Sequence, residues 1–142
     1  MILGKTWLYL ANPKTATTSV ESVLEKYGLK PFPGRKHMTA GEAKMRVRWF
    51  DDLWVFTFRR KEETRLRSFW NSRVKYGKMD LTFEEFKSNP EVSDRYFAQW
   101  KYTKGADFVG TYEHLQTDFN SICDHIGIPR TKLPHLNKGE YK

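Results

Sequence analysis

The sequence predicts an α/β fold in which a small central parallel sheet is flanked by helices. Three short apolar runs, at residues 7–11, 53–58 and 108–112, are rich in aromatic residues and typical of buried strands. Each run is followed by a segment with apolar residues at helical spacing. Strands that alternate with helices favour a parallel sheet, whose ligands bind at the carboxyl ends of the strands. The loops that follow the strands are therefore where function is expected.

Length and composition predict one domain over residues 1–142. The hydrophobic share of 39% and the aromatic share of 15% exclude a disordered chain. No apolar run approaches the roughly 18 residues that a membrane span needs. The single cysteine, Cys123, cannot form an internal disulfide, and the first residues lack the pattern of a signal peptide. We therefore expect a cytoplasmic protein without a transmembrane segment.

The first strand, at residues 7–11, ends at Asn12-Pro13, because proline cannot donate a hydrogen bond to a strand ladder. A helix is expected next, since apolar residues recur at helical spacing and Gly28 provides a stop. These residues are Val20, Val23, Leu24 and Tyr27. The chain therefore opens with a strand, a loop and a helix.

The second strand, at residues 53–58, precedes a helix that begins near Glu62-Glu63, where acidic side chains complement the helix dipole. The apolar side of this helix is formed by Leu66, Phe69, Trp70 and Val74. Shorter helical pieces are expected at residues 83–86 and 94–102. The third strand, at residues 108–112, precedes a helix that is closed by Gly127. Its apolar face is formed by Leu115, Phe119, Ile122, Cys123 and Ile126.

The net charge of +8 is concentrated in one part of the chain. Residues 35–78 hold 13 lysines and arginines against 5 acidic residues, an excess of eight, whereas bases and acids cancel elsewhere. Such a block indicates an anionic partner: a nucleic acid, a membrane surface or a multiply phosphorylated small molecule. A solvated basic face is the alternative.

The first candidate binding loop is residues 12–19, between the first strand and its helix. A helix N-terminus presents backbone N–H groups without intrahelical partners, and Lys14 adds a positive charge. The loop is therefore suited to a phosphate or sulfate group. It is not a Walker A loop, since that glycine pattern is missing and Gly4-Lys5-Thr6 lies before the strand. The alternative is that Thr17, Thr18 or Ser19 merely caps the helix.

The second candidate loop follows the second strand. Arg60 stands at the strand end and Ser68 two turns into the next helix, so both side chains are placed to converge on one anion. With this loop, the sequence resembles the PAPS-dependent sulfotransferases. Residues 13–18 resemble their P-K-[ST]-G-[TG]-[TS] loop, which binds the 5′-phosphosulfate. Arg60, Arg65 and Ser68 match the defining places of their R-[ND]-P-x-x-R-x-x-S motif, which binds the 3′-phosphate.

Four further segments resemble the carbohydrate-type branch of this family, in the family's order. They are residues 36–40, 109–115, 127–129 and 133–138. The resemblance covers the chain from about Leu8 to Lys138, and the chain is identified as an unusually short member, a single minimal sulfotransferase-like domain.

The resemblance implies a P-loop-like three-layer fold and an enzyme. Its reaction moves a sulfuryl group from 3′-phosphoadenosine-5′-phosphosulfate (PAPS) to an acceptor hydroxyl, for which a sugar is one candidate, by in-line transfer and without a metal. The product of the donor is adenosine 3′,5′-bisphosphate (PAP). By this resemblance, Lys14 is expected to neutralise the leaving oxygen. The donor-binding residues are Lys14, Thr15, Ala16, Thr17, Thr18, Ser19, Arg60, Ser68, Tyr112 and Lys138, although a tyrosine such as Tyr112 is as often a core residue.

Two departures from the family pattern carry expectations. Ala16 stands where a glycine is usual, so we expect φ below zero at Ala16 or a re-shaped loop. Lys61-Glu62 replaces Asn/Asp-Pro, which removes a rigid turn and places an acid near the phosphate site.

The acceptor hydroxyl needs a general base, and His37 is the candidate. It lies in a basic stretch 23 residues before Arg60, as the catalytic histidine precedes the arginine in cytosolic sulfotransferases. The neighbouring Arg35 is placed to steady the transferred group, and nearby positive charge lowers the pKa of such a histidine and keeps it unprotonated. Glu42 and Glu21 are the substitutes, since carbohydrate-type members often use glutamate. His114, His125 and His135 are interpreted as helix-surface or loop residues.

Other functions share parts of this pattern. A P-loop-type nucleotide kinase has the same strand, loop and helix plan, but requires Walker glycines and an aspartate for Mg²⁺. A nucleic-acid-binding module would use the basic block with Trp49, Phe50, Trp54 and Trp70, but Trp54 and Trp70 fall on buried positions. A protein that binds the donor without transferring sulfate is a third alternative.

Overall fold

The computed structural model describes residues 1–78, 80–89 and 98–134. In this part of the chain, four strands form one sheet in the order β1-β2-β3-β4. They are β1 (Ile2–Leu3), β2 (Trp7–Tyr9), β3 (Trp54–Arg59) and β4 (Phe108–Thr111). β2, β3 and β4 run parallel, as predicted.

The prediction of a purely parallel sheet is wrong at one edge. β1 pairs antiparallel with β2, with Ile2 opposite Tyr9 and Leu3 opposite Leu8, so the sheet is mixed. A tight turn reverses the chain between the two strands, closed by a hydrogen bond of 2.9 Å from Gly4 N–H to the Trp7 carbonyl. β1 has only two residues, too few to show an alternating pattern, so the sequence does not predict this strand.

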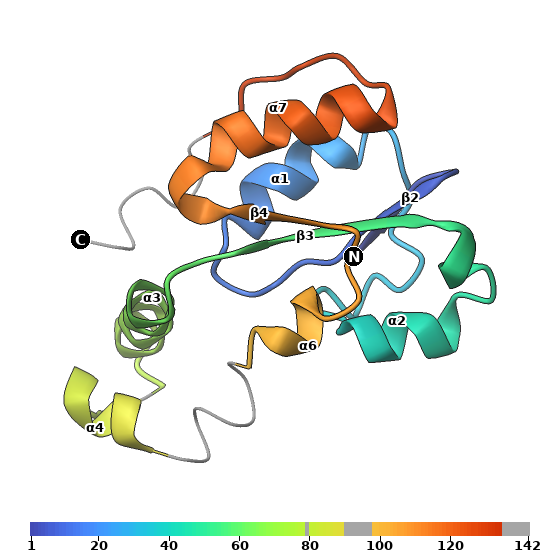
Figure 1. The fold of residues 1–142 in the computed structure, drawn as a ribbon. Helices are drawn as coiled ribbons and strands as arrows, with labels where there is room; N and C mark the ends of the chain where they lie inside the picture. Colours follow the sequence, from blue (N-terminus) through green and yellow to red (C-terminus); the bar gives the residue numbers. More distant parts are fainter. Residues whose placement is uncertain (79, 90–97, 135–142) are drawn as a thin grey trace.

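Helices lie on both faces of the sheet and at one of its ends (Figure 1). α1 (Thr17–Leu24) and α7 (Leu115–Ile126) cover one face, and α2 (Ala40–Arg46) and α6 (Trp100–Thr103) cover the other. α3 (Glu62–Lys75) and α4 (Phe83–Ser88) lie beyond the carboxyl end of β3. Short 3₁₀ turns at Phe50–Asp52 and Tyr112–His114 connect these elements. The fold class is therefore α/β with helices in layers about a four-stranded mixed sheet.

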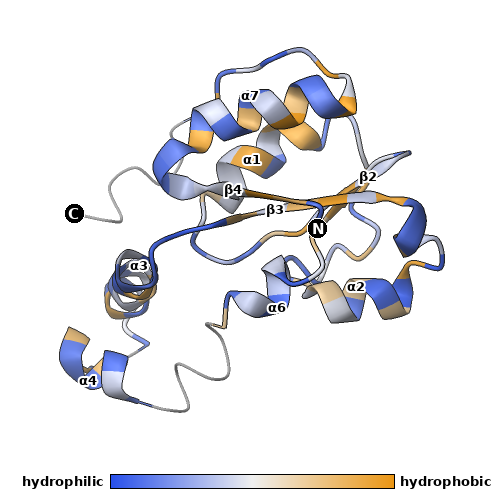
Figure 2. Cartoon of the chain, viewed as in Figure 1, coloured by the Kyte–Doolittle hydropathy of each residue, from blue (hydrophilic) through white to orange (hydrophobic). Residues whose placement is uncertain are grey.

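The alternation of side chains along the strands explains why they are apolar throughout. Tyr9, Phe56 and Phe58 pack towards α1 and α7, whereas Leu8 and Val55 pack towards α2. Figure 2 shows the same concentration of apolar residues along the strands. Burying each such side chain contributes about 1.5–3 kcal/mol, so both faces of the sheet stabilise the fold.

The helix ends follow local signals. α1 ends at Leu24, one turn earlier than the pattern to Tyr27 predicts, and Tyr27 is exposed. α7 ends where predicted, with Gly127 in the left-handed conformation at φ 80°. The expected helix at residues 94–102 is described only from Ala98 on, and residues 94–97 lie outside the described part. Among the described residues, no helix has the length and apolar character to cross a bilayer.

Candidate functional site

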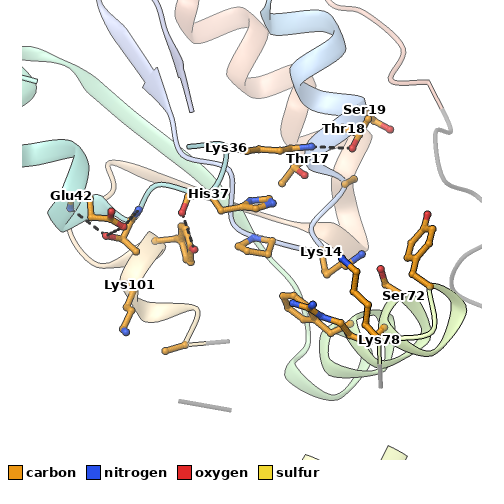
Figure 3. A pocket seen from close by; sticks show the side chains of 18 residues that line it. Lys14, Thr17, Thr18, Ser19, Lys36, His37, Glu42, Ser72, Lys78 and Lys101 are labelled. Atoms are coloured by element: carbon orange, nitrogen blue, oxygen red, sulfur yellow. Dashed lines mark hydrogen bonds between the residues drawn. The ribbon is translucent and has the colours of Figure 1, made fainter. Parts of the chain in front are cut away.

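A cavity of about 750 Å³ lies where the chain leaves the carboxyl ends of β2 and β3 (Figure 3). Its walls are the loop into α1, the segment around His37, the second half of α3 and α6. The described residues that line it are Pro13, Lys14, Ala16, Thr17, Thr18, Ser19, Lys36, His37, Thr39, Glu42, Phe69, Ser72, Arg73, Tyr76, Lys78, Ala98, Lys101 and Tyr102. The predicted donor loop and the predicted base therefore face one cavity.

The loop before α1 holds two residues in the left-handed region. Lys14 has φ 64° and Ala16 has φ 65°, so the first of the two expectations for Ala16, φ below zero, is wrong, and the re-shaped loop stays a prediction. Each costs about 1–2 kcal/mol, because Cβ then crowds the following carbonyl. The surrounding contacts impose this conformation, and such strain concentrates at ligand sites.

Two buried arginines hold the loop through its carbonyl groups. Arg65, fully buried, donates from Nε to the Pro13 carbonyl at 3.0 Å and from Nη2 to Asn12 Oδ1 at 2.9 Å. Arg60 donates from Nη1 to the Lys14 carbonyl at 3.2 Å. Thr15, also fully buried, donates from Oγ1 to the Asn12 carbonyl at 2.7 Å. The side chain of Thr15 therefore stabilises the loop and does not line the cavity.

The N-terminus of α1 presents its backbone donors at the cavity wall. The N-cap is Ala16, and no side chain of the described residues caps this helix, which disfavours the interpretation of Thr17, Thr18 and Ser19 as mere caps. The N–H groups of the first turn have no intrahelical acceptors, and the helix dipole adds a partial positive charge. This end of the helix favours an anion.

His37 is held in one tautomer beside this loop. Its Nδ1 lies 2.8 Å from the Ala11 carbonyl, which can only accept, so Nδ1 carries the proton and Nε2 keeps its lone pair. Removal from water by the surrounding chain lowers the pKa of His37 to about 4, although the bond to the Ala11 carbonyl raises it. The charges of Lys36, the N-terminal ammonium and Lys14 lower this pKa further. The ring is therefore neutral near pH 7.

The two alternative bases differ in their placement. Glu42 lines the cavity, but its carboxylate is ion-paired with Arg35 and closes a capping box with Thr39. Glu21 is buried, and its Oε1 lies 3.8 Å from the N-terminal ammonium. It is not among the described residues of the cavity wall. Arg35, which was expected to steady the transferred group, does not line the described wall either.

The predicted 3′-phosphate residues lie next to the loop rather than on the described cavity wall. The Arg60 guanidinium stacks 4.0 Å from the centre of the Tyr112 ring. Ser68 is 1% exposed, and its Oγ has no hydrogen-bond partner among the described residues. An unsatisfied buried hydroxyl costs about 1–3 kcal/mol, which a ligand oxygen would relieve. Lys138 and His135 lie outside the described residues.

Gln99 is a positioning residue that the sequence pattern does not reveal. Its Oε1 accepts from Asn12 Nδ2 and from Arg60 N–H, both at 3.0 Å. Its Nε2 donates to the Arg60 carbonyl and to Glu62 Oε2, both at 2.7 Å. One side chain thus ties the ends of β2 and β3 together, and no periodicity or motif marks it.

His114, His125 and Trp70 contact other residues of the chain and do not line the described cavity wall. His114 contacts Thr111 Oγ1 at 3.2 Å, and His125 stacks on Trp54 with 3.8 Å between ring centres. Trp70 donates from Nε1 to the Leu81 carbonyl at 2.6 Å. Within the described ranges, no group of three His, Cys, Asp or Glu side chains is arranged to hold a metal ion.

Comparison of the chain with models of known protein families, with curated proteins and with solved structures finds no match. The function is therefore argued from the cavity itself.

Proposed function

We propose that this protein is a PAPS-dependent sulfotransferase with a P-loop-like arrangement of its first strand, loop and helix. The observation that carries the proposal is that Lys14, the N-terminus of α1 and the neutral ring of His37 face one cavity. This combination offers an anion site beside a base that can accept a proton. A sulfuryl transfer requires both groups in one place.

The residues present fit the anionic groups of PAPS. Lys14, Thr17, Thr18 and Ser19 would bind the 5′-phosphosulfate through side chains and backbone N–H groups. Ser68 Oγ, which has no hydrogen-bond partner among the described residues, and the Arg60 guanidinium would bind the 3′-phosphate next to the loop, off the described cavity wall. The Tyr112 ring beneath Arg60 offers an aromatic surface to the adenine.

In this proposal the chain contributes charge, orientation and a proton acceptor. PAPS, when bound, supplies the sulfuryl group that passes to the acceptor oxygen. Lys14 stabilises the negative charge that develops on the leaving phosphate oxygen. His37 accepts the proton of the acceptor hydroxyl at Nε2, while its Nδ1–H stays bonded to the Ala11 carbonyl. Bound anions beside His37 would raise its pKa towards the range of an effective base.

Calorimetry with PAP tests the donor site without an acceptor. We expect PAP to bind with a micromolar Kd, and Lys14→Ala and Arg60→Ala each to weaken binding by about tenfold or more, since each removes a charge-assisted contact. Lys44→Ala is the matched control, because Lys44 pairs with Asp51 at 3.7 Å and does not line the described wall. Failure of PAP to bind would overturn the proposal.

The same titration separates the competing functions. A kinase would bind ATP in a magnesium-dependent way and prefer it to PAP. A nucleic-acid-binding module would bind random oligonucleotides with a steep salt dependence, and PAP would not compete. Transfer of labelled sulfate from PAPS to a panel of hydroxyl compounds then tests activity, and an inactive PAP-binding protein would be revealed by binding without transfer.

A further inference from the structure

The position of the His37 ring depends on contacts with other parts of the chain. His37 belongs to no helix or strand of the described residues and lies in the segment between α1 and α2. The fully buried side chain of Met38 attaches this segment to the core, and the bond from Nδ1 to the Ala11 carbonyl fixes one edge of the ring. The position of Nε2 then depends on how the backbone of His37 is oriented.

Tyr102, on α6, holds this backbone. Its Oη donates to the His37 carbonyl at 3.3 Å, and Figure 3 draws this bond as a dashed line. The carbonyl belongs to the peptide group between His37 and Met38, so the bond sets the direction of that peptide group. Tyr102 is 7% exposed and lines the same cavity as His37. The tyrosine therefore fixes His37 from inside the site.

The hydroxyl of Tyr102 remains a hydrogen-bond donor near neutral pH. Burial raises the pKa of Tyr102 above its usual value of 10, while the charge of Arg65 lowers this pKa and the carboxylate of Glu42 raises it. The phenol is therefore protonated near pH 7 and does not compete with His37 as a proton acceptor. Tyr102 acts on a reaction through the residue that it holds.

α6 connects this tyrosine to the loop before α1. Tyr102 N–H donates to the Gln99 carbonyl at 2.9 Å, and Gln99 Oε1 accepts from Asn12 Nδ2 at 3.0 Å. Asn12 begins the loop that carries Lys14 to the cavity. Two polar side chains of one short segment thus contact both the candidate anion loop and the backbone of His37.

We propose that Tyr102 is a positioning residue, which holds the His37 backbone so that the imidazole faces the anion site. This inference rests on the proposed function, in which His37 is the base, and adds to it a residue that acts through His37. Loss of the hydroxyl keeps the aromatic ring in place but releases the peptide group after His37. The imidazole then loses the fixed orientation that proton transfer from the acceptor requires.

NMR of the ¹⁵N-labelled imidazole measures the orientation of His37 in the free protein. In the wild type we expect the Nδ1–H tautomer and a pKa of about 4. Tyr102→Phe removes only the hydroxyl. In this variant the pKa of His37 should rise towards 6.5, because a released ring is more exposed to water, and the ¹⁵N shifts should indicate a mixture of both tautomers.

The kinetic test uses sulfate transfer from PAPS to an acceptor that the panel of hydroxyl compounds identifies. Tyr102→Phe should lower kcat about tenfold and leave the KM for PAPS and the Kd for PAP within about twofold, since the donor loop is intact. Tyr9→Phe is the matched control. Tyr9 is fully buried and its Oη has no hydrogen-bond partner among the described residues, so kcat and the His37 signals should not change.

Gln116→Met separates positioning from a general loss of stability, because Gln116 bonds to residues 131 and 133 and does not line the described cavity wall. If the His37 signals or kcat of Tyr102→Phe match the wild type, or if Gln116→Met changes them equally, Tyr102 does not position His37 and the sulfotransferase proposal stands. If PAP does not bind, the sulfotransferase proposal fails. The NMR comparison in the free protein then still decides whether Tyr102 holds His37.

Discussion

The backbone of Lys14 and Ala16 stores strain beside the cavity. Neither residue is a glycine, yet both are left-handed, and the bonds of Arg65 and Thr15 hold the loop in this form. The fold stabilises this arrangement at a cost of about 1–2 kcal/mol for each residue. Strain of this kind keeps backbone N–H groups pre-oriented, which agrees with a site that binds an anion.

Ala16→Gly should stabilise the protein. Glycine adopts a φ of about 65° without a Cβ clash, and the strain removed from the folded state outweighs the added conformational entropy of the unfolded chain. The free energy of unfolding should therefore rise by about 0.5–1 kcal/mol. Urea unfolding measures the change. Ala40→Gly, at the first residue of α2, is the control and should destabilise by up to about 1 kcal/mol. Equal destabilisation by both substitutions would contradict the left-handed conformation at Ala16.

The low pKa of His37 predicts a pH-dependent stability. Its folded pKa of about 4 lies below the usual value of 6.5, so the unfolded state binds more protons between these values. Stability is therefore full above about pH 6.5 and falls as the pH drops towards about 4. His37→Asn keeps a donor for the Ala11 carbonyl and removes the titration. Urea unfolding at about pH 7.5 and about pH 5 should show a smaller loss in the variant than in the wild type, and equal losses would exclude His37 as the cause.

At the scale of elements, polar side chains connect the residues that follow the ends of β2 and β3. β3 ends at Arg59, and Gln99 then pairs with both the N–H and the carbonyl of Arg60. Arg65 connects α3 to the loop that follows β2. The relative position of the two candidate binding loops thus depends on a few polar side chains.

Gln99→Met should therefore lower both stability and donor binding. It leaves the Arg60 backbone groups without their partner, which costs about 1–3 kcal/mol. Gln116→Met is the matched control, because Gln116 makes similar bonds to the Thr131 carbonyl and to Leu133 N–H. Both variants should be less stable to urea, but only Gln99→Met should weaken PAP binding in calorimetry. Equal PAP affinity in the two variants would remove Gln99 from the site.

For the whole molecule, the charge is unevenly distributed. The excess of eight positive charges falls within residues 35–78, and five of the described cavity residues are basic. Repulsion among these positive charges destabilises the folded chain, and the same charges attract anions. Salt weakens both effects, because it shortens the range of electrostatic interactions.

Added salt should thus stabilise the fold and weaken PAP binding. Raising NaCl from about 0.05 to about 0.5 M shortens the Debye length about threefold. Urea unfolding should then shift to a higher midpoint, while the PAP Kd from calorimetry rises. A Kd that does not change with salt would show that the basic cavity is not the PAP site.

Much of the fold follows from local patterns. The runs at residues 7–11, 53–58 and 108–112 match the three parallel strands to within two residues at each end, because a strand buried on both faces must be apolar throughout. β1 and α2 are not predicted. α2 buries only Ala43, so it has no apolar stripe, and its readable signal is the Thr39–Glu42 capping box.

The sequence predicts the loops that carry the candidate site, but it does not predict the cavity that they line. Lys14 and His37 are indicated by loop position and residue type. The sequence does not indicate that Lys78 and Lys101 line the same cavity, because these residues lie far from the loop in sequence and reach the cavity through the packing of α3 and α6. The predicted pair Arg60 and Ser68 lies off the described wall, which spacing along a helix does not reveal.

The sequence by itself determined the order of the three parallel strands and of the helix that follows each, the location of the positive charge and the loop that precedes α1. These properties depend on periodicity and composition over a few neighbouring residues. Only the tertiary structure decided that the loop is left-handed at Ala16, that Gln99 joins two strand ends, and that His37 shares a cavity with Lys14. The reason is physical: such contacts join residues distant in sequence, and their geometry follows from how the elements pack.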